Sequence, residues 1–288
     1  MSRLSAALLL ALAFTAAARN PPADAKPDNQ PFPPYRIIAN IYYVGASDIA
    51  SYLITTPAGN ILINSGYEDT PPLIRNSILK LGFKLADIKI LLNSQAHYDH
   101  VAGQAAMQRM TGAKIYSSAR EVDVLETGGK ADTRFGREHT YPPVKVDHVV
   151  RDLEQVTLGG TTLVAHMTPG HSIGCTTWTL RVSDAGRTYN VVIVGGTSIN
   201  PGVQLLHHPT YPGIAEDYAR TFQTFHALPC DIFLGAHGAY YDMKEKYEKM
   251  KAGATVNPFI DPAGYRAFID RSEQAYRDQL AKERAASR

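Results

Sequence analysis

The sequence predicts a single α/β domain with its sheets inside and its helices outside. Two observations carry this prediction: each half of the chain opens with strand-like segments and continues into a helical segment, and no Pro/Gly-rich linker divides the halves. The hydrophobic content of 44% in 288 residues is enough for a sizeable core. We therefore assign residues 35–288 to one domain.

The first half begins with the pattern of an antiparallel meander. Apolar or alternating runs at 36–44 and 51–56 predict strands, and 57–60 predicts the hairpin turn that leads back through 61–63. A helix is expected over 71–81, because apolar residues recur there at helical spacing after a Thr-Pro start.

The next segment has the pattern of a buried strand followed by a functional loop. The almost wholly apolar run 88–92 predicts a strand that is buried on both faces. It leads into a polar loop over 93–100, and a helix is expected over 101–110. Strand, polar loop and helix in this order place functional groups at the carboxyl edge of a sheet.

The second half repeats the order of strands and then helices. A hairpin is expected over 156–165, and strands over 175–180 and 189–194. The remaining predicted elements are a helix over 214–228, a buried strand over 231–234 and an amphipathic helix over 262–282.

The charge of the chain is close to balanced, with a formal net charge of +2. The sequence therefore gives no reason to expect nucleic acid or an acidic membrane as a partner. The two cysteines, Cys175 and Cys230, both border apolar strand-like runs. Two cysteines cannot form a disulfide framework, and two separate buried thiols are favoured over one bridge.

The N-terminus has the pattern of a secretory signal peptide. Arg3 precedes an apolar run over 4–15, too short to span a bilayer, and small residues follow at 16–18. We expect cleavage after about Ala18, a periplasmic mature chain, and no stable association with the membrane; an uncleaved anchor is the alternative. Residues 19–34 are rich in Pro, Asn and Asp and are expected to form a flexible lead into the domain.

The strongest functional signal is the hexapeptide QAHYDH that follows the buried strand. His97, Asp99 and His100 fall within four consecutive residues, and imidazole and carboxylate are the ligands that zinc prefers when cysteine is absent. His171 and His237 are further candidates, because each follows a strand in a Gly-containing loop. The other histidines are expected to be structural or surface residues: His139, His148, His166, His207, His208 and His226.

Longer motifs extend this signal to a family resemblance. The string QAHYDHVAG, with TPGH at 168–171 and GAHG at 235–238, resembles the metallo-β-lactamases and is most similar to their third subclass. The segments TGGKAD at 127–132, YPP at 141–143 and NPG at 200–202 support the same resemblance. It covers nearly the whole mature chain and implies a four-layer αβ/βα sandwich.

The resemblance also implies two zinc sites. The usual motif is H-x-H-x-D-H, and Gln95 stands here where the first ligand is normally His, as it does in a minority branch of the third subclass. A neutral amide oxygen is a poorer zinc ligand than imidazole, so we expect one or two Zn²⁺ per chain with the Gln95 site weaker. The implied first site is Gln95, His97 and His171, and the implied second site is Asp99, His100 and His237.

The implied reaction is hydrolysis of the β-lactam amide bond of penicillins, cephalosporins and carbapenems, which confers antibiotic resistance. A zinc-bound water has its pKa lowered to about 7, and the resulting hydroxide would attack the lactam carbonyl. Asp99 would bind the second zinc and hold the nucleophile by a hydrogen bond, which makes it the candidate catalytic residue. The sequence contains no G-x-S-x-G elbow and no S-x-x-K arrangement with its partner motifs.

Other hydrolases of the same fold are the main alternative. Thioesterases, lactonases and nucleases resemble the chain around the ligand loop, but they typically carry a bridging Asp on the strand equivalent to 191–196. That strand here ends in Val-Gly-Gly-Thr-Ser, which favours the lactamase branch. A zinc-binding protein without catalysis is the second alternative.

Substrate contacts are expected from two segments. Thr197, Ser198 and Asn200 follow a strand towards the metal edge, and by resemblance this loop carries polar groups near the substrate carboxylate, although the family's usual serines are not both matched. Phe135 and Tyr98 are expected either as apolar walls or as ordinary packing. The expected partner is a small β-lactam, with no nucleic acid, and the expected state is a monomer.

Overall fold

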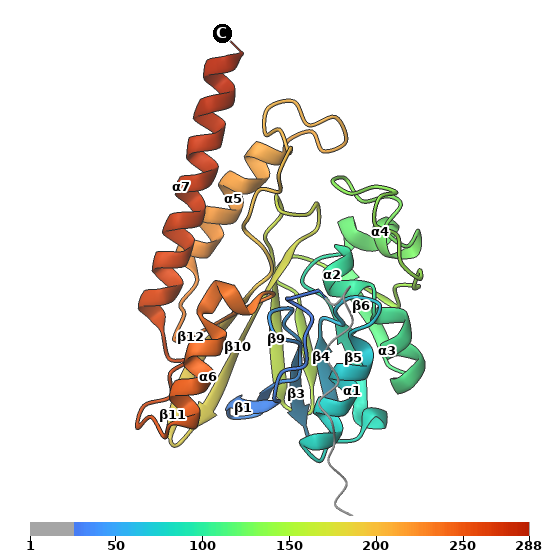
Figure 1. The fold of residues 1–288 in the computed structure, drawn as a ribbon, viewed down its shortest axis with the longest axis vertical. Helices are drawn as coiled ribbons and strands as arrows, with labels where there is room; N and C mark the ends of the chain where they lie inside the picture. Colours follow the sequence, from blue (N-terminus) through green and yellow to red (C-terminus); the bar gives the residue numbers. More distant parts are fainter. Residues whose placement is uncertain (1–25, 288) are drawn as a thin grey trace, which may run out of the picture.

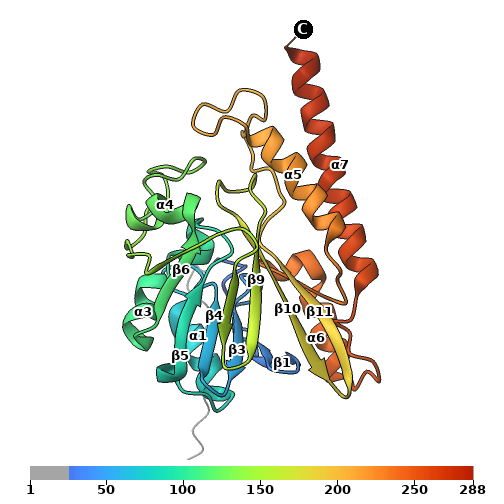
Figure 2. The same ribbon diagram turned by 180° about the vertical axis from the view of Figure 1, so that it is seen from behind.

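The computed structural model describes residues 26–287 and shows two sheets with helices on their outer sides (Figures 1 and 2). The expected signal peptide, residues 1–18, lies outside the described residues. Helices α1 and α3 flank one sheet and helices α5 and α7 flank the other (Figure 1). This confirms the α/β sandwich with sheets inside and helices outside.

The first sheet combines an antiparallel and a parallel part. Strands β1 to β4 pair antiparallel, and β4, β5, β6 and β7 pair parallel. The parallel strands end at a common edge, which matters for the site. In spatial order the strands are β1 (Tyr35–Ile38), β2 (Ile41–Tyr43), β3 (Tyr52–Thr56), β4 (Gly59–Ile63), β5 (Ile88–Leu92), β6 (Lys114–Ser118) and β7 (His148–Val150). The helices of this half are α1 (Pro71–Lys80), α2 (Tyr98–Val101), α3 (Gln104–Thr111) and α4 (Val122–Glu126), with the 3₁₀ turn η2 (Ala119–Glu121).

The second sheet is antiparallel except at one edge. Strands β8 to β11 pair antiparallel, and β12 joins β11 in parallel. In spatial order the strands are β12 (Ile232–Gly235), β11 (Arg187–Val194), β10 (Thr176–Asp184), β9 (Thr161–Met167) and β8 (Gln155–Leu158). The helices are α5 (Ile214–Ala227), α6 (Met243–Lys251) and α7 (Pro262–Ala286), and the end of α7 projects beyond the rest of the molecule (Figure 2).

Alternation along the strands of the first sheet creates the layers. Ile54 and Ile63 lie in the core between the sheets, where they share one apolar cluster with the fully buried Trp178 of β10. Leu53 and Leu62 lie in a second cluster on the opposite face, together with apolar residues of α1 and α3. Because successive side chains of a strand point to opposite faces, a sheet covered on both sides must be apolar at nearly every position.

Several predicted elements differ in extent. The expected strand 36–44 divides at Ala39, whose φ of 45° breaks the extended backbone, and the expected helix 101–110 divides into α2 and α3. Helix α2 also begins earlier, inside the segment expected to be loop. The elements β6, β7, α4 and α6 were not predicted, because they are short or lack a clear period.

The described part of the expected flexible lead, residues 26–34, lies against the domain instead. Asn29 is buried, its side chain donates to Asp69 Oδ1 at 2.9 Å, and it accepts from the Thr70 hydroxyl at 2.7 Å. Burial of a polar side chain is favourable here because both ends of the amide are paired. Thr70 makes no side-chain capping bond at the start of α1.

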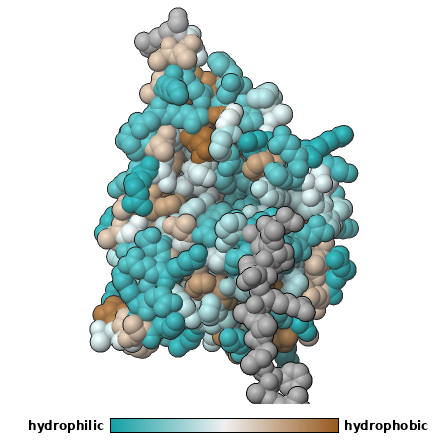
Figure 3. All heavy atoms as spheres, in the orientation of Figure 1, coloured by the Kyte–Doolittle hydropathy of each residue, from teal (hydrophilic) through white to brown (hydrophobic). Residues whose placement is uncertain are grey.

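Both cysteines are free, as expected, and Cys175 is buried while Cys230 is partly exposed. The face of the molecule in Figure 3 is largely hydrophilic, with apolar residues in small separate groups. Within residues 26–287, no helix combines the length and the apolar character needed to cross a membrane.

Candidate metal centre

The candidate ligands come from three loops and from the short helix α2, which carries Asp99 and His100, at one edge of the two sheets. The loop after β5 carries Gln95 and His97, the loop between β9 and β10 carries His171, and β12 leads directly to His237. The rings of His97 and His171 are 4.8 Å apart between centroids. The structure therefore brings together residues that lie far apart in the sequence.

The loop after β5 is fixed to both sheets by hydrogen bonds. Asn64, at a φ of 63°, accepts from the Ser94 backbone N–H at 2.8 Å. The Thr176 N–H donates to the Ser94 carbonyl at 2.7 Å, and the Trp178 indole donates to the Asn93 carbonyl at 2.9 Å. These bonds hold the backbone just before the first candidate ligand against both sheets.

Asp99, His100 and His237 form a compact cluster. Each offers one ligand atom, and these atoms all lie within 4.8 Å of one another. His100 Nε2 is 3.2 Å and His237 Nε2 is 3.5 Å from Asp99 Oδ2. Neither ring nitrogen of His100 has a hydrogen-bond partner among residues 26–287, although the ring is fully buried. A buried imidazole without partners fits a metal ligand, since buried polar atoms are otherwise paired.

Asp48, a residue that the sequence did not single out, orients His237. Its Oδ2 lies 3.0 Å from His237 Nδ1, and its Oδ1 accepts from the Ala239 N–H at 2.7 Å. A carboxylate on the far nitrogen of a ligand histidine fixes the ring orientation and raises its basicity. No sequence signal marks Asp48, because it lies in the turn between β2 and β3, 189 residues from His237.

The protonation states of His97, His100, His171 and Asp99 suit metal binding, whereas that of His237 does not. Burial lowers the pKa of His97, His100 and His171, in His100 to about 4, so these rings are neutral near pH 7. Burial alone would raise the pKa of Asp99, but His100 and His237 hold it well below its usual range. Burial would lower the pKa of His237, but Asp48 and Asp99 raise it to about 9. A cation that binds here must displace the proton of His237.

Gln95, His97 and His171 form the second group of donors. His171 Nδ1 donates to the Ser198 carbonyl at 2.7 Å, which leaves its Nε2 available to a metal. The Gln95 amide nitrogen donates to the Gly195 carbonyl at 3.3 Å, while its oxygen is buried and has no hydrogen-bond partner in the described part of the chain. The orphaned oxygen fits the expected role of Gln95 as an oxygen donor.

A cavity of about 370 Å³ opens above these groups. Phe135, Ser198 and Asn200 line it, as expected, and so does Tyr98. Thr197 does not: it is buried, its hydroxyl lies 3.1 Å from Ser272 Oγ of α7, and it borders a neighbouring cavity of about 480 Å³. The remaining lining residues are Asp48, Asp99, His171, His237, Ala239 and Tyr240.

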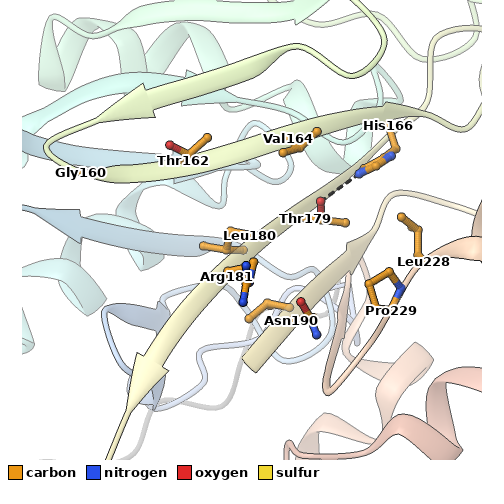
Figure 4. A pocket seen from close by; sticks show the side chains of 11 residues that line it. Gly160, Thr162, Val164, His166, Thr179, Leu180, Arg181, Asn190, Leu228 and Pro229 are labelled. Carbon is orange, nitrogen blue, oxygen red and sulfur yellow. Dashed lines mark hydrogen bonds between the residues drawn. The ribbon is translucent and has the colours of Figure 1, made fainter. Parts of the chain in front are cut away.

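One histidine expected to be structural extends the aromatic wall. His139 stacks on Tyr98 with 4.0 Å between ring centroids and lies edge-on to Phe135 at 5.2 Å. A lone histidine in a loop has no pattern from which this role could be inferred. His166 behaves as expected and bonds to Thr179 at 2.9 Å in a separate cavity of about 440 Å³ on the second sheet, which none of the candidate ligands lines (Figure 4).

A sequence profile of the family described as the Metallo-beta-lactamase superfamily matches residues 44–237 of this chain. A metal-dependent hydrolase of Cupriavidus necator is 30% identical over 150 residues, and this match spans 50% of the chain and 50% of that protein. The chain thus matches about half the length of this curated relative.

Solved structures are similar over almost the whole described domain. The FEZ-1 metallo-beta-lactamase from Legionella gormanii is 46% identical, with 90% of this chain and 99% of that chain covered and a TM-score of 0.88. BJP-1, a subclass B3 metallo-beta-lactamase of Bradyrhizobium japonicum, is 40% identical, with coverage of 91% and 98% and a TM-score of 0.84. LRA-12, a class B3 di-zinc metallo-beta-lactamase from an Alaskan soil metagenome, is 36% identical, with coverage of 90% and 98% and a TM-score of 0.84.

Proposed function

This chain belongs to the metallo-beta-lactamase superfamily, and from this premise we propose that it is a zinc-dependent β-lactamase of the B3 type. Similarity to solved B3 β-lactamases over nine tenths of the chain supports the proposal. The observation that carries it within the fold is the end of β11 and the turn after it, residues 194–198, which hold no carboxylate, whereas the thioesterases and lactonases that the chain resembles typically carry a bridging Asp on this strand.

The space around Gly195 and Gly196 in this turn admits no side chain. A Cβ added at Gly196 would lie 2.5 Å from His171 Cδ2, and one added at Gly195 would lie 2.8 Å from Cys175 Sγ. Contacts between such atoms are ordinarily about 3.5–4.0 Å, so neither position has room for a carboxylate. Residues 191–198 contain no acidic side chain that could bridge two metals, and this supports the lactamase proposal over the alternatives.

The donors favour zinc, because they are imidazoles, one carboxylate and one amide oxygen. A bound zinc ion would supply a Lewis acid and would lower the pKa of water to about 7. The Gln95 oxygen donates less charge than an imidazole, so we propose that its site binds zinc more weakly than the Asp99 site. Residues 1–18 have the pattern of a signal peptide, so we propose that the mature chain, after their removal, acts in the periplasm and confers antibiotic resistance.

The chain's own groups then have separable roles. Asp99, kept as a carboxylate, accepts a hydrogen bond from the attacking water and orients it. Phe135 and Tyr98 exclude solvent and pack on the apolar part of the β-lactam. Ser198 and Asn200, which also line the cavity, offer hydrogen bonds to the substrate carboxylate.

The test uses the purified mature protein with a chromogenic cephalosporin, a lactone and a thioester as separate substrates. We expect β-lactam turnover that is abolished by a chelator and restored by zinc, with little turnover of the other two. Asp99→Asn should lower kcat at saturating zinc, while Glu154→Gln, a surface carboxylate change, should not. Turnover that survives exhaustive chelation, or a preference for the lactone or thioester, would overturn the proposal.

A further inference from the structure

Glu121 is a buried carboxyl that the proposed reaction does not use. It is only 1% exposed and ends η2, the turn that directly follows β6. Because β5 and β6 are parallel neighbours, this turn lies at the same sheet edge as the loop with Gln95 and His97. A carboxyl in such a place is costly unless donors surround it.

The partners of Glu121 are the neighbours of the candidate ligands. Glu121 Oε1 accepts from the Ser172 hydroxyl and, at 3.2 Å, from the Gly174 N–H. The backbone amide of Ala96 acts on the same carboxyl. Ser172 directly follows His171, and Ala96 lies between the other two donors of the first site. One carboxyl thus contacts both loops that carry the first ligand set.

Burial raises the pKa of Glu121 to about 7, although the hydrogen bonds from Ser172, Ala96 and Gly174 lower it. The largest influences on this pKa include no cation. The interactions that favour the Glu121 carboxylate are therefore its hydrogen bonds to the two loops and not an ion pair, and the nearby Asp132 carboxyl opposes its charge.

Two further hydrogen bonds hold the same two residues, Ala96 and Gly174, through their carbonyl groups. The Tyr141 hydroxyl donates to the Ala96 carbonyl at 2.8 Å, and the Ser118 hydroxyl donates to the Gly174 carbonyl at 2.7 Å. The backbone N–H and the backbone carbonyl of each of these two residues are thereby both hydrogen-bonded. None of these bonds involves the second ligand set, whose His237 is oriented by Asp48 instead.

We propose that Glu121 is a positioning residue of the first metal site, joining the loop of Gln95 and His97 to the loop of His171 and so setting the spacing of the three donors. The inference rests on the proposed metal site, but not on which substrate is hydrolysed. Because the Gln95 amide is a weak donor, the metal affinity of the first site depends more strongly on the preorganised geometry of its three donors, and hence on Glu121. Loss of such an outer contact typically costs 10–100-fold in metal affinity.

The experiment titrates the metal-free mature protein in two separate series. Co²⁺ binding is followed by cobalt absorption, and Zn²⁺ binding is followed by competition with a chromogenic chelator. Gln95→Ala identifies the signal of the first site. Glu121→Leu is expected to weaken that site about 10–100-fold and to leave the Asp99 site unchanged. Glu121→Gln is expected to have a smaller effect, because one amide oxygen can still accept from Ser172 and Gly174, which share Oε1.

Two matched controls separate positioning from general damage. Asp48→Asn should give the reverse pattern, weakening the Asp99 site and sparing the first, and Glu154→Gln should change neither. If Glu121→Leu does not fold, as judged by the thermal transition of the metal-free protein, Ser172→Ala keeps the carboxyl and should weaken the first site in the same direction.

Equal losses at both sites, or wild-type affinities in a folded Glu121→Leu or Ser172→Ala variant, would overturn the inference. A wild-type protein that binds a single ion unaffected by Glu121→Leu would overturn it too. Metal binding that responds as expected without any β-lactam turnover would refute the proposed function but support the role of Glu121.

Discussion

The close contact between His171 and Gly196 allows a test of whether the His171 ring must occupy its present position for metal to bind. A Cβ added at Gly196 would lie 2.5 Å from His171 Cδ2 and 2.8 Å from His171 Cγ. Since carbon atoms normally approach to about 3.5 Å, the Gly196→Ala change must displace the ring by about 1 Å. The ring cannot simply swing aside, because its Nδ1 is bonded to the Ser198 carbonyl at 2.7 Å.

Metal–ligand distances tolerate only about ±0.2 Å, so a shift of this size removes His171 from the ligand set. We expect Gly196→Ala to lose zinc from the first site and to retain it at the Asp99 site. A misplacement of about 1 Å at a catalytic centre costs roughly 10²-fold in rate, and kcat should fall by about this factor at limiting zinc.

The assay combines metal analysis after dialysis with steady-state hydrolysis of a chromogenic cephalosporin. Gly82→Ala is the control, because a Cβ at that glycine meets nothing within 4 Å and Gly82 is remote from the metal centre. Its φ of 85° disfavours alanine, so we expect this change to lower the free energy of unfolding by about 1 kcal/mol and to leave metal binding unchanged. Wild-type zinc content and kcat in Gly196→Ala would refute the claim that this glycine sets the place of His171.

Three further predictions follow from other parts of the molecule. Gln95→His should tighten the weaker site by about 10–100-fold, measured by zinc titration; unchanged affinities would show that Gln95 is not a ligand. Burial alone would raise the pKa of Asp261, but hydrogen bonds from Lys246 and from the first turn of α7 lower it. The ionised carboxylate of Asp261 therefore stabilises the folded chain above the unfolded pKa of about 4, and this stabilisation is lost as the pH falls through the folded pKa. We expect Asp261→Asn to lower the free energy of unfolding by about 1 kcal/mol at pH 7 and by much less at pH 2, as measured by urea unfolding. Mass spectrometry of unreduced, denatured protein should find two alkylatable thiols, and finding none would indicate a bridge.

Local patterns predicted the parts of the fold that have a clear period. Strand β5 was predicted with its observed bounds, because five consecutive apolar or snorkelling residues between polar turns favour a buried strand. Helix α5 and the hairpin of β8 and β9 were also predicted, because each has strong spacing and a turn signal. Strand β6 was missed, because its sequence KIYSS mixes apolar and polar residues without alternation.

The candidate ligands could be predicted because metal ligation needs particular residue types, and these cluster in short motifs. The residues that orient them could not, since their role depends on contacts that only the folded chain creates. Glu121 and Ser172 are 51 positions apart, and Asp48 and His237 are 189 apart. A single carboxylate in a turn carries no periodicity, so no sequence pattern distinguishes Asp48 or Glu121 from an exposed acid.

The two ligand sets differ in how many of their residues line the substrate cavity, and this difference indicates which set has the larger influence on kcat. Asp99 and His237 of the second set line the cavity wall, whereas from the first set only His171 does so, and Gln95 and His97 are buried beneath it. A substrate in the cavity therefore meets mainly groups of the second set, which also includes the candidate catalytic carboxylate. Gln95, the weaker donor, is fully buried and does not line the cavity. Strengthening it through Gln95→His should thus change zinc affinity more than kcat at saturating zinc.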